Sequence, residues 1–302
     1  MVAHKSDAEW TYNKNKGFMP MVGHIAEIGQ IVSVDFRKGN VPPAQANFEF
    51  IKQCQRALPH GCSVKALRID AAGYQTKIIQ YCDEEGIEYA IRAKMSASLR
   101  AQVESIKAVD WQPLLDKAGN VVSGQETYRT SHCIGEYEKA FTLVIQRKAI
   151  QGQASLDIGS EGDTEGMNLG GDVYRAIATN RDHKTNSELV HGYNQRAEDS
   201  ENRIKEVKLD FGGDTLPCSD FKANAMYFLI SALSFNLFAL MRSLLPEDLA
   251  HHRGMTIRWR LYAMAAKVVR TGRQLFVKLK EEHSLLLERV LLVLKEFEPP
   301  PM

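Results

Sequence analysis

The stretch from Val64 to Lys94, VKALRIDAAGYQTKIIQYCDEEGIEYAIRAK, decides the fold of this chain. Its first part, VKALRID, reads as an apolar strand that ends in an acid. AAG then turns the chain into a helix over Tyr74–Glu85, which Gly86 closes. The segment IEYAIRAK predicts the next strand. Two strands joined by a helix form a β-α-β unit, so the sequence predicts an α/β fold built on a sheet.

The segments on either side of this unit predict further elements. Upstream, the β-branched residues of Met21–Asn40 predict a hairpin, and Ala44–Leu58 has helical spacing. Downstream, Ser96–Gly171 predicts additional strands and loops inserted into the α/β domain, after which YRAIATN resumes a buried strand. From Ser187 onward the pattern is helical, with helices expected over roughly 188–208, 220–245 and 258–281, and a charged helix up to Phe297.

Composition and charge restrict the class of protein. The 302 residues carry a net charge of +1, with 44% hydrophobic and 25% charged residues, as is typical of a soluble globular chain. Residues 151–201 contain ten acids and four bases, a balance of −6, whereas residues 203–280 contain thirteen bases and six acids, a balance of +7. The basic segment predicts a surface that faces a polyanion, and the acidic one a cation-binding surface; chance segregation of charge is the alternative.

The cysteines, the N-terminus and the most apolar run bear on whether the chain binds zinc, carries a signal peptide or spans a membrane. The five cysteines form no CxxC pair, which argues against a zinc site and favours reduced thiols. The start, MVAHKSDAEW, is polar and is not a signal peptide. The most apolar run, Ala225–Met241, contains Ser231, Ser234 and Asn236, so we expect a buried core helix rather than a membrane span.

Two carboxylates lie where metal-dependent phosphodiester chemistry would need them. Asp70 ends a predicted strand, and small residues follow it; the alternative is an aspartate that caps the next helix. On a continuous helix, Glu201 shares a face with Lys205 and Lys208, at about 40° and about 20°. An ordinary helix with salt bridges four residues apart explains that spacing equally well. Carboxylate oxygens in a partly hydrated site would suit Mg²⁺.

Several motifs together resemble one known family. Tyr193, Arg196, Glu201 and Lys208 resemble the Tyr-Arg-Glu-Lys signature of DDE transposases from bacterial insertion sequences. LRIDAAGY resembles the segment that holds the second catalytic aspartate of these enzymes. LPCSDFKANAMYFLISALSFNLFALMRSLLP and TIRWRLYAMAAKVVRTGRQ resemble the C-terminal helices of the insertion sequence 1380 family. The similarity covers nearly the whole chain, to about Lys280.

The resemblance implies an α/β, ribonuclease-H-like fold: a mixed sheet with flanking helices, a β-rich insertion and a helical C-terminal part. It would divide the chain into the first part of the catalytic core, the insertion, the second part of the core and a helical C-terminal region, over residues 1–95, 96–171, 172–215 and 216–302.

The resemblance also implies site residues and partners. Asp70 and Glu201 would be the second and third acidic ligands of Mg²⁺ or Mn²⁺. The residues expected to hold DNA phosphates are Tyr193, Arg196 and Lys208, with Lys205 on the same face. The expected partners are double-stranded DNA, at transposon ends and at the target, and other copies of the chain in a synaptic complex, without a membrane, at the nucleoid in the bacterial cytoplasm. In the family reaction, water frees a 3′ hydroxyl at the transposon end, and that hydroxyl then attacks target DNA.

The chain departs from the family signature in the spacing of the helix. Four residues separate Arg196 from Glu201, whereas the signature has three. In an unbroken helix the extra residue moves the two side chains from about 40° to about 140° apart. Three alternatives follow: a π-bulge absorbs the residue, the helix restarts with Ser200 as its N-cap, or Glu198 is the ligand in place of Glu201. The spacing from Glu201 to Lys208 favours Glu201.

The second departure concerns the first catalytic aspartate, which in the family lies on a strand before the stretch that matches VAHKSDAEW. Asp7 lies too far along the chain to replace it, and Asp35 matches a later strand. We therefore expect either an N-terminally truncated transposase that is weakly active or inactive alone, or a gene whose start has been assigned too late. The alternatives are a non-catalytic DNA-binding or oligomerisation remnant that regulates full-length enzyme, and an unrelated soluble α/β protein.

Overall fold

The computed structural model describes residues 5–12, 14–149, 166–196 and 200–296. These residues belong to two compact units. The sheet unit is Val41–Glu201, and the terminal unit combines Met1–Asn40 with Asn202–Met302. The sheet unit holds the predicted β-α-β segment, and the terminal unit holds the predicted hairpin and the C-terminal helices.

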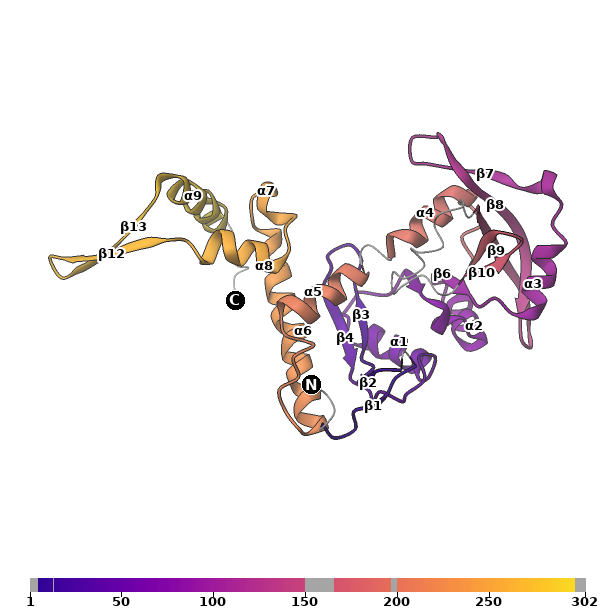
Figure 1. Ribbon diagram of the computed structural model, residues 1–302, viewed down its shortest axis with the longest axis horizontal. Coiled ribbons are helices and arrows are strands. Elements are labelled where there is room, and N and C mark those ends of the chain that lie inside the picture. Colours follow the sequence, from indigo (N-terminus) through magenta and orange to yellow (C-terminus); the bar gives the residue numbers. More distant parts are fainter. Residues whose placement is uncertain (1–4, 13, 150–165, 197–199, 297–302) are drawn as a thin grey trace. The chain divides into compact units, whose positions relative to one another are not determined.

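A seven-stranded sheet forms the centre of the sheet unit (Figure 1). Its strands lie in the order β5-β6-β11-β9-β8-β7, and β10 pairs with β11. Only the pair β5–β6 is parallel; every other pair of described strands in this sheet is antiparallel. The strands are β5 (Ala66–Ile69), β6 (Glu88–Ala93), β7 (Gln112–Leu115), β8 (Val121–Ile134), β9 (Tyr137–Ala149), β10 (Met167–Leu169) and β11 (Asp172–Thr179).

The β-α-β unit predicted from the sequence is confirmed. Strand β5 leads into a short 3₁₀ helix, η1 (Ala71–Gly73), and then into α2 (Thr76–Glu84). Gly86 follows the helix with φ of +65°, a conformation that glycine adopts without steric cost, and the chain enters β6.

Helices cover both faces of the sheet. Successive residues of a strand point to opposite faces, so neighbouring residues of β6 pack against different helices. Tyr89 and Ile91 of β6 pack with α1 (Asn47–Arg56), α2 and α3 (Ala97–Glu104). Ala90, between them, packs with α4 (Asn186–Arg196) on the other face. A 3₁₀ turn, η2 (Ala108–Asp110), precedes β7. The sheet unit is therefore a mixed α/β structure, as the sequence predicts.

In the terminal unit, the predicted hairpin packs on the long helix α6 (Phe221–Ser243). The hairpin consists of β3 (Met21–His24) and β4 (Ile31–Asp35), which are antiparallel, and a small sheet of β1 (Glu9–Trp10) and β2 (Lys16–Gly17) precedes it. The side-chain amide of Asn236 bonds both the amide N and the carbonyl O of Ile31, at 2.7 Å each. Four aromatic rings pack between the hairpin and the helix: Phe18, Phe36, Phe221 and Phe228.

Helix α6 is apolar around most of its circumference. One face is buried, with Phe228, Ala232 and Phe235 in the core of the terminal unit. Leu229, Leu233 and other side chains of the opposite face remain about half exposed. By length and composition alone α6 could cross a membrane, with a mean hydropathy of 1.5 and 33% of that window buried. The expected core helix is thus packed on one face and carries an uncovered apolar stripe on the other.

Two secondary-structure predictions are wrong. The segment read as strands and loops from Ser96 begins with the helix α3 (Ala97–Glu104), and residues 258–281 do not form a helix. The helix α8 (Gly254–Ile257) continues only into a π-helical turn, η5 (Arg258–Tyr262). The chain then forms a two-stranded ribbon of β12 (Ala266–Thr271) and β13 (Gln274–Leu279). Gly272 and Arg273, with φ of +55° and +64°, make the two-residue turn that a helix cannot contain.

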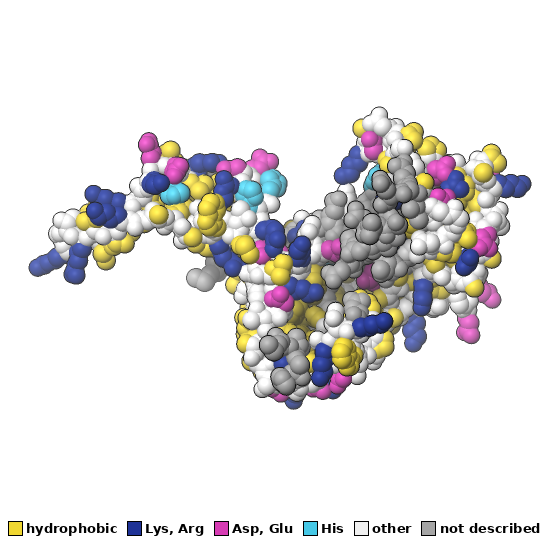
Figure 2. All heavy atoms as spheres, in the orientation of Figure 1, with side chains coloured by type: hydrophobic (Ala, Val, Ile, Leu, Met, Phe, Trp, Pro, Cys, Tyr) yellow, Lys and Arg dark blue, Asp and Glu magenta, His cyan; other side chains and the backbone are white. Residues whose placement is uncertain are grey.

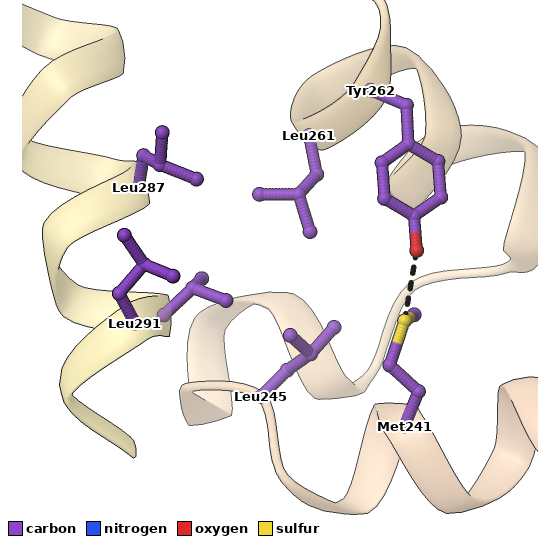
Figure 3. A pocket seen from close by; sticks show the side chains of 7 residues that line it. Met241, Leu245, Leu261, Tyr262, Leu287 and Leu291 are labelled. Carbon is purple, nitrogen blue, oxygen red and sulfur yellow. Dashed lines mark hydrogen bonds between the residues drawn. The ribbon is translucent and has the colours of Figure 1, made fainter. Parts of the chain in front are cut away.

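The C-terminal helix α9 (Glu281–Glu296) packs with α6, α7 (Glu247–Ala250), α8 and η5 through part of its leucine stripe. Between these elements lies an apolar cavity of about 190 Å³ (Figure 3). The Tyr262 hydroxyl at its edge donates to Met241 Sδ at 2.8 Å. The cavity is lined by Met241, Leu245, Leu261, Tyr262, Leu287, Val290 and Leu291, and this apolar lining does not fit phosphate chemistry.

Candidate active site

Asp70 directly follows β5 at its carboxyl end. Its Oδ1 atom accepts a hydrogen bond of 3.1 Å from the amide of Ala72, so the aspartate caps η1. Of the small residues expected beside it, Gly73 is required sterically, because a Cβ atom added there would lie 2.4 Å from Ile69 Cγ2. The capping role that the sequence left as an alternative is therefore confirmed, and a metal bound by Asp70 would have to leave this hydrogen bond in place.

Helix α4 contains Tyr193 and Arg196 of the signature and is called the signature helix below. Two hydrogen bonds connect it to the end of β5. The hydroxyl of Tyr193 donates to the carbonyl O of Ile69 at 3.2 Å, and Arg68 Nη1 donates to the carbonyl O of Gly192 at 2.7 Å. The Tyr193 ring is 5% exposed and packs among the apolar residues on this face of the sheet. The structure thus brings Asp70 and Tyr193 to the same end of the same strand, although 123 positions separate them in the sequence.

Glu201 is exposed and lies between α4 and α5 (Asn202–Asp210) in the sequence. Arg196 is the last residue of α4, and residues 197–199, including Glu198, lie outside the described residues. Ser200 and Glu201 have π-helical conformation, and α5 begins directly after them. This conformation agrees with the first of the three alternatives for absorbing the extra residue.

Helix α5 separates its charges between two environments. Lys205 and Lys208 are exposed, whereas Glu206 and Asp210 are 5% and 6% exposed. Glu206 accepts from the amide of Gly254 at 2.8 Å and pairs with Arg242 at 3.2 Å. Asp210 pairs with Arg253 at 2.7 Å and accepts from the amide of Met255. The two acids hold the terminal unit together, and the two lysines are left to face solvent.

The sequence as a whole matches one protein family. A family model described as "Transposase DDE domain group 1" matches residues 2–297. The chain belongs to this family. A search of curated proteins finds no match. The mixed sheet with helices on both faces is consistent with the ribonuclease-H-like fold of a DDE transposase domain.

DDE transposase domains generally use divalent metal ions, so the oxygen donors of this domain can be compared with that need. Asp70 and Glu201 supply carboxylate oxygens, the donor type that Mg²⁺ and Mn²⁺ prefer. Among the described residues, however, no group of three or more His, Cys, Asp or Glu side chains lies close enough together to hold a metal. The donor chemistry fits a metal site, but the described part of the chain does not complete one.

Three arginines on one face of the sheet in this DDE transposase domain were missed in the sequence. Arg68, Arg92 and Arg175 come from β5, β6 and β11, and the strand register places them on the face that α4 covers. The Arg92 guanidinium lies 5.3 Å from the centre of the Tyr193 ring. Burial lowers the pKa of Arg175, and the positive charge of Arg92 lowers it further. One arginine inside each apolar strand (ALRI, EYAIRA, DVYRAIAT) was the available signal.

Proposed function

We propose that this DDE transposase domain serves as the transposase of a bacterial insertion sequence of the 1380 family. It would bind double-stranded DNA at transposon ends and at the target, and catalyse metal-dependent DNA cleavage and strand transfer. The observation that carries the proposal is the hydrogen bond from Tyr193 to Ile69, because it holds α4, the helix that carries Tyr193 and Arg196 of the signature, at the end of the strand that precedes Asp70.

In this proposal Asp70 and Glu201 hold Mg²⁺ or Mn²⁺. Such ions activate the attacking oxygen and offset the charge that develops on the leaving one. Lys205 and Lys208, exposed on α5, together with Arg196 at the end of α4, would neutralise DNA phosphates. Tyr193 would position the end of β5 through its bond to Ile69, in addition to the phosphate contact that the resemblance implies for it.

A complete two-metal centre would need a further carboxylate beside Asp70 and Glu201, and no group of three or more His, Cys, Asp or Glu side chains is found among the described residues. We propose that metal binding at this centre requires both Asp70 and Glu201. The proposed divisions at residues 95, 171 and 215, the assembly of several copies in a synaptic complex, and a cytoplasmic location at the nucleoid without a membrane belong to the same proposal.

A second candidate function is a non-catalytic remnant that binds DNA or full-length transposase and regulates it. The finding that favours it is the incomplete set of metal ligands among the described residues. An upstream in-frame segment that encodes a strand with an aspartate would favour the enzyme, and its absence would favour the remnant.

The experiment measures excision of a marker placed between the two DNA sequences that flank the gene. It compares the 302-residue chain with the product of any longer upstream reading frame. Asp70→Asn keeps an acceptor for the Ala72 amide but removes a metal ligand, and Glu201→Gln removes the other. Asp116→Asn is the matched control, because Asp116 also caps a turn, through Ala118 and Asn120, in an exposed loop.

We expect excision by at least one of these products, loss of that excision in Asp70→Asn and Glu201→Gln, and its retention in Asp116→Asn. Excision that survives both active-site substitutions would overturn the proposed function.

A further inference from the structure

The ribbon β12–β13 carries a concentration of positive charge, and no acid lies within it. Between Thr256 and Lys280 there are seven basic residues and no acidic one. Five of the seven lie in or directly after the ribbon: Lys267, Arg270, Arg273, Lys278 and Lys280. Within the described part of the chain, no ion pair is found for these five. Figure 2 shows dark blue side chains gathered on this element, where Figure 1 draws the ribbon.

The arrangement of these charges is unfavourable for the ribbon alone. Lys267 is paired directly with Lys278 across the two strands, so two ammonium groups occupy neighbouring positions on one face. Like charges directly opposite each other destabilise a strand pair. An isolated two-stranded hairpin is in any case only marginally stable in water. A polyanion bound along the ribbon would relieve this repulsion and order the two strands.

The ribbon is also accessible on both faces. Ten of its twelve strand residues are exposed, and the two exceptions are Val269 and Leu279. Val268 and Val277, a cross-strand pair on the face opposite the lysines, are 64% and 62% exposed. The tight turn places Arg273 at the tip, in the left-handed conformation that gives a hairpin turn the same twist as its strands.

The size of the ribbon favours double-stranded DNA over double-stranded RNA as the bound polyanion. Six residues per strand extend about 20 Å, and a two-stranded antiparallel ribbon fits the major groove of B-form DNA, which is about 12 Å wide. The major groove of an RNA duplex is too deep and narrow for such an element. A second copy of the ribbon is a poor occupant, because each copy would bring the same five uncompensated charges.

We propose that the ribbon β12–β13 is a DNA-binding element that enters the major groove of double-stranded DNA, with its lysines and arginines on the phosphates. This inference rests on the proposed function only for the choice of DNA as the polyanion. It adds a binding surface in the terminal unit that is separate in sequence from Asp70, Glu201 and the signature helix.

The test measures the salt dependence of duplex binding by fluorescence anisotropy, with a labelled duplex long enough to cover the whole chain and EDTA to prevent cleavage. The full chain is compared with the triple variant Arg270→Gln, Arg273→Gln, Lys278→Gln. The matched control is Lys77→Gln, Lys107→Gln, Lys117→Gln, which removes the same charge from positions of the sheet unit. Circular dichroism and thermal unfolding establish that all three proteins are folded.

The ribbon variant should lower the slope of log Kd against log salt by about 3, since each phosphate that is no longer neutralised removes roughly 0.9 from the slope. The control should keep a slope closer to that of the unsubstituted chain. An unchanged slope in the ribbon variant, or an equal loss in the control, would overturn the proposal. So would equal affinity for an RNA duplex of the same length, or binding of the ribbon to vesicles rich in anionic lipid in preference to DNA.

Failure of this proposal is distinguishable from failure of the proposed function. Asp70→Asn should bind the duplex with the unsubstituted salt slope, because the ribbon remains intact. If the ribbon variant loses its slope but no metal-dependent excision is ever found, the ribbon proposal stands and the transposase proposal falls. If excision requires Asp70 but the ribbon variant binds DNA normally, the transposase proposal stands and the ribbon proposal falls.

Discussion

The hydroxyl of Tyr193 donates a hydrogen bond of 3.2 Å to the carbonyl O of Ile69, the residue directly before Asp70. This hydrogen bond joins the signature helix to the strand end that bears the candidate metal ligand. The second tie, from Arg68 to the carbonyl of Gly192, lies beside it. The geometry of the candidate active site therefore depends on side chains that do not themselves bind metal.

Replacement of Tyr193 by phenylalanine should weaken this connection without emptying the core. The ring stays in its apolar surroundings, and only the hydrogen bond is removed, which corresponds to about 1 kcal/mol of unfolding free energy. Urea unfolding measures the change. Tyr12→Phe is the control, because the Tyr12 side chain is 65% exposed and should give no measurable loss. Equal stability of the two variants would contradict the positioning role.

Two glycine substitutions at the same site should have opposite signs. Gly73→Ala forces a methyl group against Ile69, at 2.4 Å from Cγ2, and should destabilise the protein by about 1–3 kcal/mol. Gly192→Ala lies in α4 with no heavy atom within 4 Å of the added Cβ, and should stabilise it by roughly 0.5–1 kcal/mol. Thermal unfolding of both variants measures these changes, and a loss of stability in Gly192→Ala would contradict the packing described here.

Glu206→Ala should be among the most damaging changes in the terminal unit. The substitution leaves Arg242, with a side chain 18% exposed, without its carboxylate partner, and leaves the amide of Gly254 without its acceptor. Breaking a buried pair in this way costs about 3–5 kcal/mol. The comparison is Glu247→Ala, whose carboxylate is 94% exposed and whose loss should change stability by less than about 0.5 kcal/mol. Chemical denaturation followed by circular dichroism is the measurement.

The cysteines should divide by reactivity. Burial raises the pKa of Cys82 to about 12 and that of Cys54 to about 11, so near neutral pH both remain almost entirely thiols. The thiolate is the reactive form, so both should label slowly until the protein unfolds. Cys62 and Cys133 are exposed and should label first. Peptide mapping by mass spectrometry locates the modified residues, and labelling of Cys82 at the rate of Cys62 would contradict the burial.

The elements that the sequence predicts correctly depend on local signals. The strand that ends at Ile69, the helix closed by Gly86 and the hairpin before Asn40 each combine residue periodicity with a turn signal. The ribbon at 266–279 was misread because Ile257, Leu261, Met264 and Val268 also have helical spacing, which hid the strand alternation on either side of Gly272.

The candidate site was predictable only in part, for reasons of distance and register. Asp70 and the helix that carries Tyr193 have recognisable motifs, so both could be named as candidates from the sequence. Glu206 and Asp210 read as surface acids because their partners, Arg242 and Arg253, lie 36 and 43 positions away. The arginine layer on the sheet could not be assigned to a face without the strand register that places Arg92 opposite Ile177.

The most direct test of the central claim, that Asp70 and Glu201 share a divalent metal ion, is backbone cleavage by hydroxyl radicals generated from Fe²⁺ bound in place of Mg²⁺. The account predicts cuts near residue 70 and near residue 201 in the same protein, suppressed by excess Mg²⁺. The cuts should be lost in Asp70→Asn, which keeps the cap on η1, and kept in Asp116→Asn. Cuts near only one of the two residues, or a pattern unchanged in Asp70→Asn, would contradict it.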